Sequence, residues 1–248
     1  MSCSILGIDC ATDPKKRGVA FASFEQGSCT LGRVAAGMTD RQIAELVVEA
    51  RQKNNWVLLA LDAPLGWPDP LGTSLADHHA GQPLSPPANS LFRRETDRFI
   101  KTTFGKQPLD VGADRIARTA HAALSLLAII SHALGAAVPL AWSPDLSDVT
   151  AIEVYPAATL IAYGLSDSGY KGHPERAKRQ NIIDKLPAGL VIEDHEPLLA
   201  NADILDAVLC VLAAMDFLQG NVHSPVNQAL AHKEGWIWVR HSAAAVPA

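Results

Sequence analysis

Four aspartates stand where strands or helices would otherwise carry apolar residues. Asp9 follows the apolar run SILGI, and Asp62 closes a second run, WVLLALDAP at residues 56–64. Asp203 and Asp206 lie three residues apart in NADILDAVLCVLAAMDFLQG, residues 201–220, and so share one face of a helix. Facing carboxylates repel by about 4 kcal/mol per close pair at an effective dielectric constant of 20. A cluster of them is tenable only where protons or divalent cations neutralise it.

Magnesium or manganese is the natural cation for a site made only of carboxylate oxygens. We expect Asp9, Asp62 and Asp206 to be the metal ligands. Asp203, or Glu153 from the segment IEVYP, would be a further ligand or a proton acceptor. Histidines and thiolates do not occur at the spacing of a zinc site.

Each acid also has a structural interpretation that needs no metal. Asp9 and Asp62 could cap the turns that follow their strands. Asp203 could interact with the dipole at a helix N-terminus. Glu153 could pair with an arginine at a strand edge.

Candidate substrate-binding residues, three basic and one acidic, fall in three places. Arg94 and Asp97 lie in RRETD, Arg115 opens a long helix, and Lys171 lies in GYKG. We expect them to bind substrate, because an arginine fork grips phosphate bidentately. The alternatives are an Arg–Asp pair that fixes a neighbouring segment to the core, and an ordinary turn around Lys171.

The elements that would position these residues follow from hydrophobic periodicity and turn signals. Apolar runs predict strands at 4–10, 18–25, 29–36, 56–64, 150–156 and 235–239. Helices are expected after Thr39, at 111–134, 156–163, 174–186 and 201–220. Residues 65–109, rich in proline, form an insertion that is too long for an ordinary connection.

This order is typical of the ribonuclease H-like fold, an α/β fold. Its mixed sheet is an antiparallel meander of three strands, extended by parallel strands and flanked by helices. The ends of the first and fourth strands are then neighbours, which would bring Asp9 and Asp62 together. No repeat or linker divides residues 1–248, so we expect a single domain.

Composition restricts the class of protein further. The 248 residues are 48% hydrophobic and carry a net charge of −5, which argues against a general polyanion-coating protein. The sequence contains no uninterrupted run of 18 apolar residues, so no membrane span is predicted, and no signal peptide is evident. Four cysteines without a CxxC pair fit a reducing cytoplasm. The oligomeric state is not indicated.

Several short segments occur in an order and spacing that resemble a known family. They are GIDCA, LDAPLGWP, FRRETDRFI, GADRIARTA, IEVYPAATL, YKG, DILDAVLCVLAA and EGWIW, and they span most of the chain. The sequence resembles domain-of-unknown-function family 429, described as predicted RNase H-like nucleases. The resemblance implies the ribonuclease H-like fold and metal-dependent nuclease chemistry. Holliday-junction resolvases of that fold combine strand-borne acids with a pair on the last helix, as Asp9, Asp62 and Asp203/Asp206 would.

The first functional hypothesis is therefore a nuclease that hydrolyses nucleic acid, DNA or RNA, with Mg²⁺ or Mn²⁺. Asp9 would bridge two metals, with Asp62 and Asp206 completing their shells. One alternative is an ATP-dependent phosphotransferase of the actin and sugar-kinase superfamily. The segment CATDPKKRG is poor in glycine, which disfavours it. The other alternative is a non-catalytic nucleic-acid-binding module.

Overall fold

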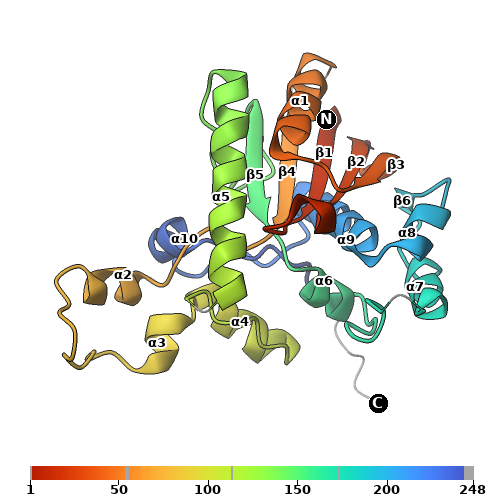
Figure 1. The fold of residues 1–248 in the computed structure, drawn as a ribbon. Coiled ribbons are helices and arrows are strands. Elements are labelled where there is room, and N and C mark those ends of the chain that lie inside the picture. Colours follow the sequence, from red (N-terminus) through yellow and green to blue (C-terminus); the bar gives the residue numbers. More distant parts are fainter. Residues whose placement is uncertain (1, 54–55, 113, 173, 243–248) are drawn as a thin grey trace.

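A six-stranded mixed sheet forms the centre of the computed structural model, which describes residues 2–53, 56–112, 114–172 and 174–242 (Figure 1). The strands lie in the order β5-β4-β1-β2-β3-β6. Their bounds are β1 Ser2–Asp9, β2 Gly18–Glu25, β3 Ser28–Ala36, β4 Val57–Asp62, β5 Val149–Glu153 and β6 Leu190–Val191. A short 3-10 helix, η1 (Pro14–Lys16), lies between β1 and β2.

Strand pairing follows the predicted pattern of a meander extended by parallel strands. β1, β2 and β3 pair antiparallel, whereas β4 runs parallel to β1 and β5 runs parallel to β4. β4 is buried along nearly its whole length, as expected for a strand covered on both faces. The expected mixed sheet is confirmed, and β6, which extends it beside β3, was not predicted.

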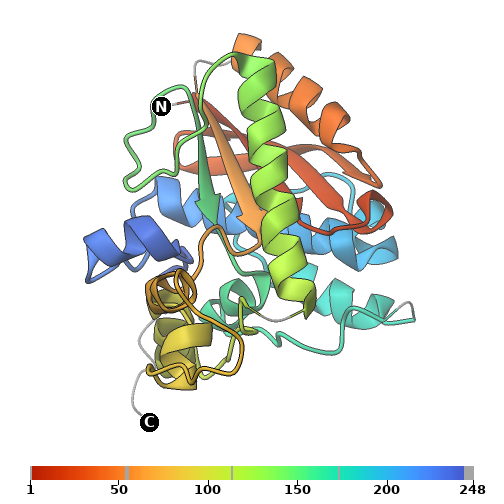
Figure 2. The same ribbon diagram turned by 60° about the vertical axis from the view of Figure 1, so that its left-hand side comes forward.

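Helices cover both faces of the sheet (Figure 2). On one face, α1 (Asp40–Lys53) and α5 (Asp114–Leu134) bury Ile43, Val47, Leu126 and Ile130 against strand residues such as Leu59. Each helix offers the sheet one apolar stripe and exposes its polar side.

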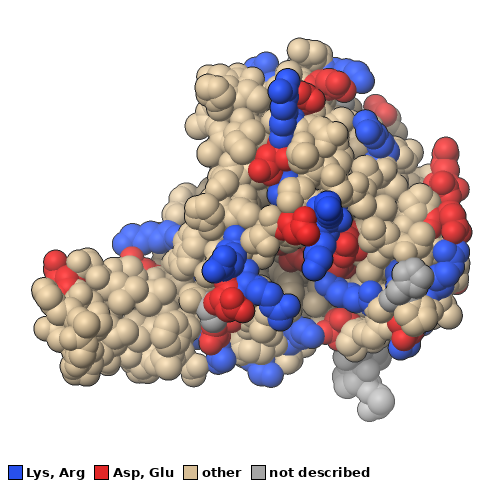
Figure 3. Space-filling view, in the orientation of Figure 1, with Lys and Arg blue, Asp and Glu red and all other residues tan. Residues whose placement is uncertain are grey.

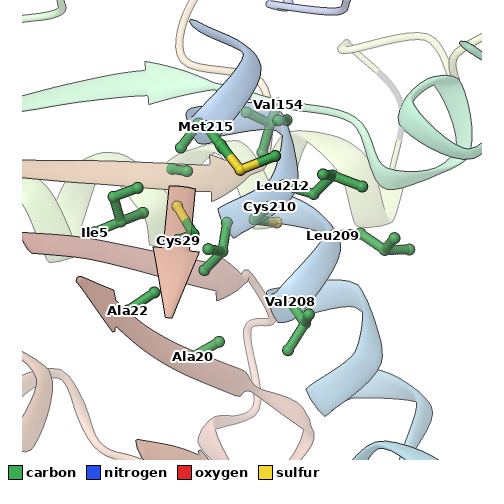
Figure 4. Packing of buried hydrophobic residues seen from close by; sticks show 14 of the residues in the cluster. Ile5, Ala20, Ala22, Cys29, Val154, Val208, Leu209, Cys210, Leu212 and Met215 are labelled. Carbon is green, nitrogen blue, oxygen red and sulfur yellow. The ribbon is translucent and has the colours of Figure 1, made fainter. Parts of the chain in front are cut away.

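On the other face lies α9 (Ala202–Leu218), where nearly every residue is buried. It packs between the sheet and the outer helices α6 (Pro156–Ala162) and α8 (Glu196–Ala200), and α7 (Arg176–Ile183) packs on α8. Figure 4 shows side chains from this core, including Val208 and Leu212 of α9 with Ile5 and Ala22 of the sheet. A helix covered on all sides needs an apolar surface all round, which explains its composition.

The proline-rich segment 65–109 is a helical insertion at the carboxyl end of β4. It contains α2 (Asp69–Leu75), α3 (Ala88–Phe92) and α4 (Glu95–Phe104) and lies beside α10 (Gln228–Glu234). In Figure 1 it projects from the lower end of the sheet. These short helices were not predicted, because prolines interrupt their periodicity.

The predicted strand at 235–239 is wrong. Ile237 forms only an isolated bridge with Glu153, and its amide donates to Oγ1 of Thr96 in α4. The segment therefore contacts both β5 and the insertion, and it forms no continuous pairing with β5. Trp236 and Trp238 on it are both buried, the first against Phe99 and the second against Phe217.

Among the described residues, one helix, α5, is long and apolar enough to cross a membrane. The expectation that no segment could do so by composition is therefore too strong for α5. In the structure α5 lies along α1 and the sheet, with Ala123, Leu126 and Ile130 buried. This packing is compatible with a soluble α/β protein.

Candidate functional site

Asp9 and Asp62 end two neighbouring parallel strands and lie directly opposite each other. They are paired residues in the register of β1 and β4. Parallel strands hold their carboxyl ends at the same edge of a sheet, so both side chains belong to one edge. The expected juxtaposition of these two aspartates is confirmed.

Two glycines allow α9 to approach that edge. A Cβ atom at Gly7 would lie 2.1 Å from the carbonyl oxygen of Ala207, and one at Gly18 would lie 1.9 Å from that of Asp203. No side chain fits at these distances, so only glycine lets the α9 backbone rest directly on β1 and β2. The first turns of α9, with Asp203 and Asp206, are held against the strand ends as a result.

Asp206 is the most deeply buried acid of this group. Its side chain is 1% exposed, and its Oδ1 accepts a hydrogen bond of 2.6 Å from the Tyr170 hydroxyl. Its Oδ2 lies 2.7 Å from Nζ of Lys171, whose side chain is 64% exposed. Lys171 thus reaches from the surface to a buried carboxylate.

Burial and neighbouring aspartates raise the pKa values of Asp9, Asp62 and Asp203. Burial, and then the charges of Asp62 and Asp206, raise the pKa of Asp9 to about 9. Burial and the charge of Asp206 raise the pKa of Asp62 to about 7. The pKa of Asp203 is also raised, by burial and then by Asp206. The four carboxyl groups therefore share one electrostatic environment with an excess of negative charge.

The nearby cation compensates only part of this charge. Burial by itself would lower the pKa of Lys171, but Asp206, Asp62 and Asp9 outweigh burial and raise it. One ammonium group therefore stands beside three carboxyl groups. We name Asp9, Asp62, Asp206 and Lys171 the carboxylate centre.

In the part of the chain that the structure describes, no group of three or more His, Cys, Asp or Glu side chains is already arranged around a metal position. The group next to the Oδ2 atom of Asp206 is the ammonium of Lys171 and not another carboxylate. The donor set nevertheless fits Mg²⁺ or Mn²⁺, because it consists of carboxylate oxygens with uncompensated charge. Asp9, Asp62 and Asp206 are the residues that could hold such an ion.

Arg94, Asp97 and Glu153 form a separate buried network. The Arg94 guanidinium donates to both Glu153 oxygens at 2.7 and 2.8 Å and to both Asp97 oxygens at 2.9 and 3.1 Å. Arg94 is 1% exposed. The pKa of Glu153 is raised by burial, and Arg94 opposes that rise. These contacts match the structural interpretations, an Arg–Asp pair and a Glu–Arg pair. The predicted substrate-binding role of Arg94 and Asp97 and the predicted catalytic role of Glu153 stay predictions.

Glu234 of α10, which the sequence analysis missed, completes this network. Its side chain is 1% exposed and accepts hydrogen bonds from the amides of Asp69 and Glu95, and its backbone carbonyl accepts from Arg94. The network ties the insertion to β5 and α10. We name Arg94, Asp97, Glu153 and Glu234 the arginine clamp.

A cavity of about 320 Å³ joins the carboxylate centre to the arginine clamp. Asp62 and Lys171 line one part of it, and Arg94 and Glu153 line another. Arg115 is exposed at the start of α5, one residue before Ile116, which lines the cavity. Its predicted role in substrate binding stays a prediction.

Sequence reasoning also missed the residues that shape the centre. Tyr170 lies next to Lys171 and hydrogen-bonds Asp206, and Tyr155 lines the cavity. The signal for Gly7 and Gly18 was available, because glycine inside an apolar strand indicates close approach of another backbone. No local pattern marks Tyr155 or Tyr170, since their contacts come from residues far along the chain.

A family model matches most of the chain. No curated protein matches the chain. A family model described as "Protein of unknown function (DUF429)" matches residues 7–230, a region that contains the carboxylate centre and all of the arginine clamp except Glu234. The chain therefore belongs to the DUF429 family.

Proposed function

We propose that this protein is a divalent-metal-dependent nuclease that hydrolyses phosphodiester bonds in nucleic acid in the cytoplasm. The observation that carries the proposal is the meeting of Asp9, Asp62 and Asp206 at one edge of the sheet, where burial and neighbouring carboxylates raise the pKa values of Asp9 and Asp62. Like charges at close range are costly without a function or a counter-ion. Perturbed carboxyl groups beside a cavity are a frequent property of catalytic sites.

The strand order supports the further proposal that the fold is ribonuclease H-like. The order β5-β4-β1-β2-β3, with an antiparallel meander and two parallel strands, is that of the expected sheet. Helices on both faces, and acids on β1, β4 and a late helix, agree with it. β6 and the helical insertion are additions to that core.

Asp9, Asp62 and Asp206 would hold the ion. When bound, Mg²⁺ or Mn²⁺ would lower the pKa of a water molecule and stabilise charge on the phosphate. Asp203, which is half-buried, would accept the proton of that water. Lys171 would leave Asp206 and contact the phosphate, since most of its side chain is exposed.

The surface around the centre is suited to a polyanion in spite of the net charge of −5. Figure 3 shows Lys and Arg side chains beside acidic ones near the middle of the face that carries the strand ends. Lys16, exposed in η1, is near enough to lower the pKa of Asp203. Local basic side chains of this kind bind a phosphate backbone.

The test is cleavage of labelled single-stranded, duplex and branched DNA and RNA with Mn²⁺. Wild type should cleave at least one of these substrates, and Asp9→Asn should not, because the variant lacks a metal ligand. The matched control is Asp77→Asn, which changes an exposed carboxylate in the insertion and should cleave as wild type does. Equal cleavage by Asp9→Asn would place the activity elsewhere or in a contaminant.

Metal binding is measured separately by thermal unfolding. A ligand at a hundredfold excess over Kd stabilises the native state by about 2.7 kcal/mol. Millimolar Mn²⁺ should therefore raise the Tm of wild type and of Asp77→Asn, and raise it much less for Asp9→Asn.

If wild type binds nucleic acid and does not cleave it, the protein is a binding module instead of a nuclease.

A further inference from the structure

The cavity of about 320 Å³ beside the carboxylate centre has apolar walls between two charged parts. Pro64 follows β4, Pro108 and Leu109 end the insertion, and Ile116 comes from α5. Asp62 and Lys171 form the charged end next to the carboxylate centre, and Arg94, Asp97 and Glu153 of the arginine clamp line the other charged part. Apolar walls with a few polar groups are typical of sites for small organic groups.

Tyr155 adds an aromatic ring and a polar group to this wall. It is half-buried, and among the described residues its hydroxyl forms no hydrogen bond. Burial, and then the charge of Asp62, raise its pKa to about 12, so the hydroxyl stays a hydrogen-bond donor at neutral pH. An aromatic ring with a free donor can stack on a ring and hydrogen-bond it at its edge.

Leu109 stands at the rim of the same cavity and is 66% exposed, although Pro108 before it is buried. Its side chain is therefore accessible to a ligand that enters the cavity. The cavity is at the small end of the range for ligand sites, about 300–1,000 Å³. It has room for one base and its sugar.

Resting on the function proposed above, we propose that this cavity holds one unpaired nucleobase of the substrate, with the adjoining phosphate at Lys171. The base would lie among Tyr155, Leu109 and Ile116, and its phosphate would reach the carboxylate centre from the charged end. A base in a continuous duplex cannot enter unless it leaves the stack. The protein would therefore act on single strands in preference to duplex.

The experiment measures binding without cleavage, by fluorescence anisotropy of Asp9→Asn with Mn²⁺. The probes are a labelled single strand, the same strand with abasic sites in place of its central nucleotides, and the corresponding duplex. We expect the single strand to bind at least tenfold more tightly than either of the other two. Adding Tyr155→Ala should cost about tenfold in affinity for the single strand, and Tyr155→Phe should cost much less, since stacking is retained.

Leu109→Ser provides a variant whose folding is not at risk, because the side chain is largely exposed. Its matched control is Val226→Ser, which removes another exposed apolar side chain, 98% exposed, outside this cavity. Leu109→Ser should weaken binding of the single strand severalfold, and Val226→Ser should leave it unchanged. Equal effects of the two substitutions would overturn the proposal.

Equal affinity for the single strand, the abasic strand and the duplex would also overturn it. If wild type cleaves duplex as well as single strands, the nuclease proposal stands and the nucleobase proposal fails. If no probe binds and none is cleaved, both fail.

Discussion

At the scale of single residues, the site is defined by an imbalance of charge. Asp9, Asp62 and Asp206 meet at one edge of the sheet, and Lys171 is the cation that the structure places directly on one of them, 2.7 Å from Asp206. Tyr170 donates a hydrogen bond to the other oxygen of Asp206. A metal ion bound to the Oδ2 atom of Asp206 would therefore compete with Lys171.

Substitution of Lys171 should lower the stability of the metal-free protein and increase its affinity for a metal ion. Lys171→Met should lower stability at pH 8 in EDTA by up to about 1 kcal/mol, since its exposed ammonium is screened by water. The same variant should bind Mn²⁺ more tightly, because no ammonium competes for Asp206. Thermal unfolding over a series of Mn²⁺ concentrations measures both effects.

The control for this variant is Lys178→Met. Lys178 is similarly exposed and pairs with Glu175 three residues earlier, away from the aspartates. It should change neither the stability in EDTA nor the affinity for Mn²⁺ by a measurable amount. A loss of Mn²⁺ affinity in Lys171→Met would show that Lys171 supports the metal site rather than competing for it.

The metal-free protein should lose stability as pH rises, because of Asp9. The pKa of Asp9 is about 9 in the folded state and near 3.8 in the unfolded chain, so the folded state binds the proton more tightly. This contribution is complete below pH 4 and is lost as pH rises toward 9. Asp9→Asn removes that loss and should be more stable than wild type at pH 8 by on the order of 1 kcal/mol.

Urea unfolding in EDTA between pH 5 and pH 9 measures this difference. The two proteins should be closest in stability at pH 5 and should separate as pH increases. Parallel curves across that range would mean that Asp9 is not protonated in the folded protein.

At the scale of elements, the contact between α9 and the sheet determines whether the aspartates meet. The α9 backbone lies on Gly7 of β1 and Gly18 of β2 at distances that leave no room for a side chain. Asp203 and Asp206 are near the N-terminus of α9, so a shift of the helix would move them away from Asp9. The packing of one helix therefore controls the geometry of the site.

Gly18→Ala should test this dependence. The added methyl group would lie 1.9 Å from the carbonyl oxygen of Asp203, so α9 must move. Overpacking of this kind typically costs about 1–3 kcal/mol, and a backbone neighbour gives little relief. We expect a loss at the upper end of that range, together with loss of the stabilisation by Mn²⁺, both measured by thermal unfolding.

Gly32→Ala in β3 is the matched control. A Cβ atom there would meet Phe21 at 3.6 Å, an ordinary contact. It should keep both the stability and the response to Mn²⁺. If Gly18→Ala keeps its response to Mn²⁺, Asp203 and Asp206 are not held in place by this contact.

At the scale of the whole molecule, the arginine clamp holds the helical insertion on the sheet. Arg94 links the start of α4 to Glu153 at the end of β5 and to the carbonyl of Glu234 in α10. The cavity lies between these parts, with the end of the insertion forming part of its wall. Loss of the clamp should therefore affect both stability and the cavity.

Arg94→Ala should destabilise the protein by about 3–5 kcal/mol, because it leaves Asp97 and Glu153 buried without their cation. It should also make the insertion a target of limited proteolysis. The neighbouring Arg93→Ala removes a half-buried ion pair with Asp110 and should cost less than about 1 kcal/mol. Similar unfolding curves for the two variants would contradict the role assigned to Arg94.

The sequence by itself determined most of the sheet and its main helices. Alternating or continuous apolar runs predicted five of the strands nearly to their ends, and α5 and α9 stood out by length and periodicity. These signals are local, because burial on one or two faces requires a pattern within a single segment. The position of Asp9 and Asp62 also followed, since parallel neighbours align their ends.

Only the tertiary structure decided which partner each functional side chain has. Arg94 meets Glu153 from 59 residues away and Glu234 from 140 residues away. The Tyr170 hydroxyl meets Asp206 from 36 residues away, and Gly18 of β2 meets Asp203 of α9 across most of the chain. Such pairings depend on how whole elements pack, and packing leaves no periodic signal in either segment. The sequence therefore predicted the acids of the site, and the fold determined the partners that hold them.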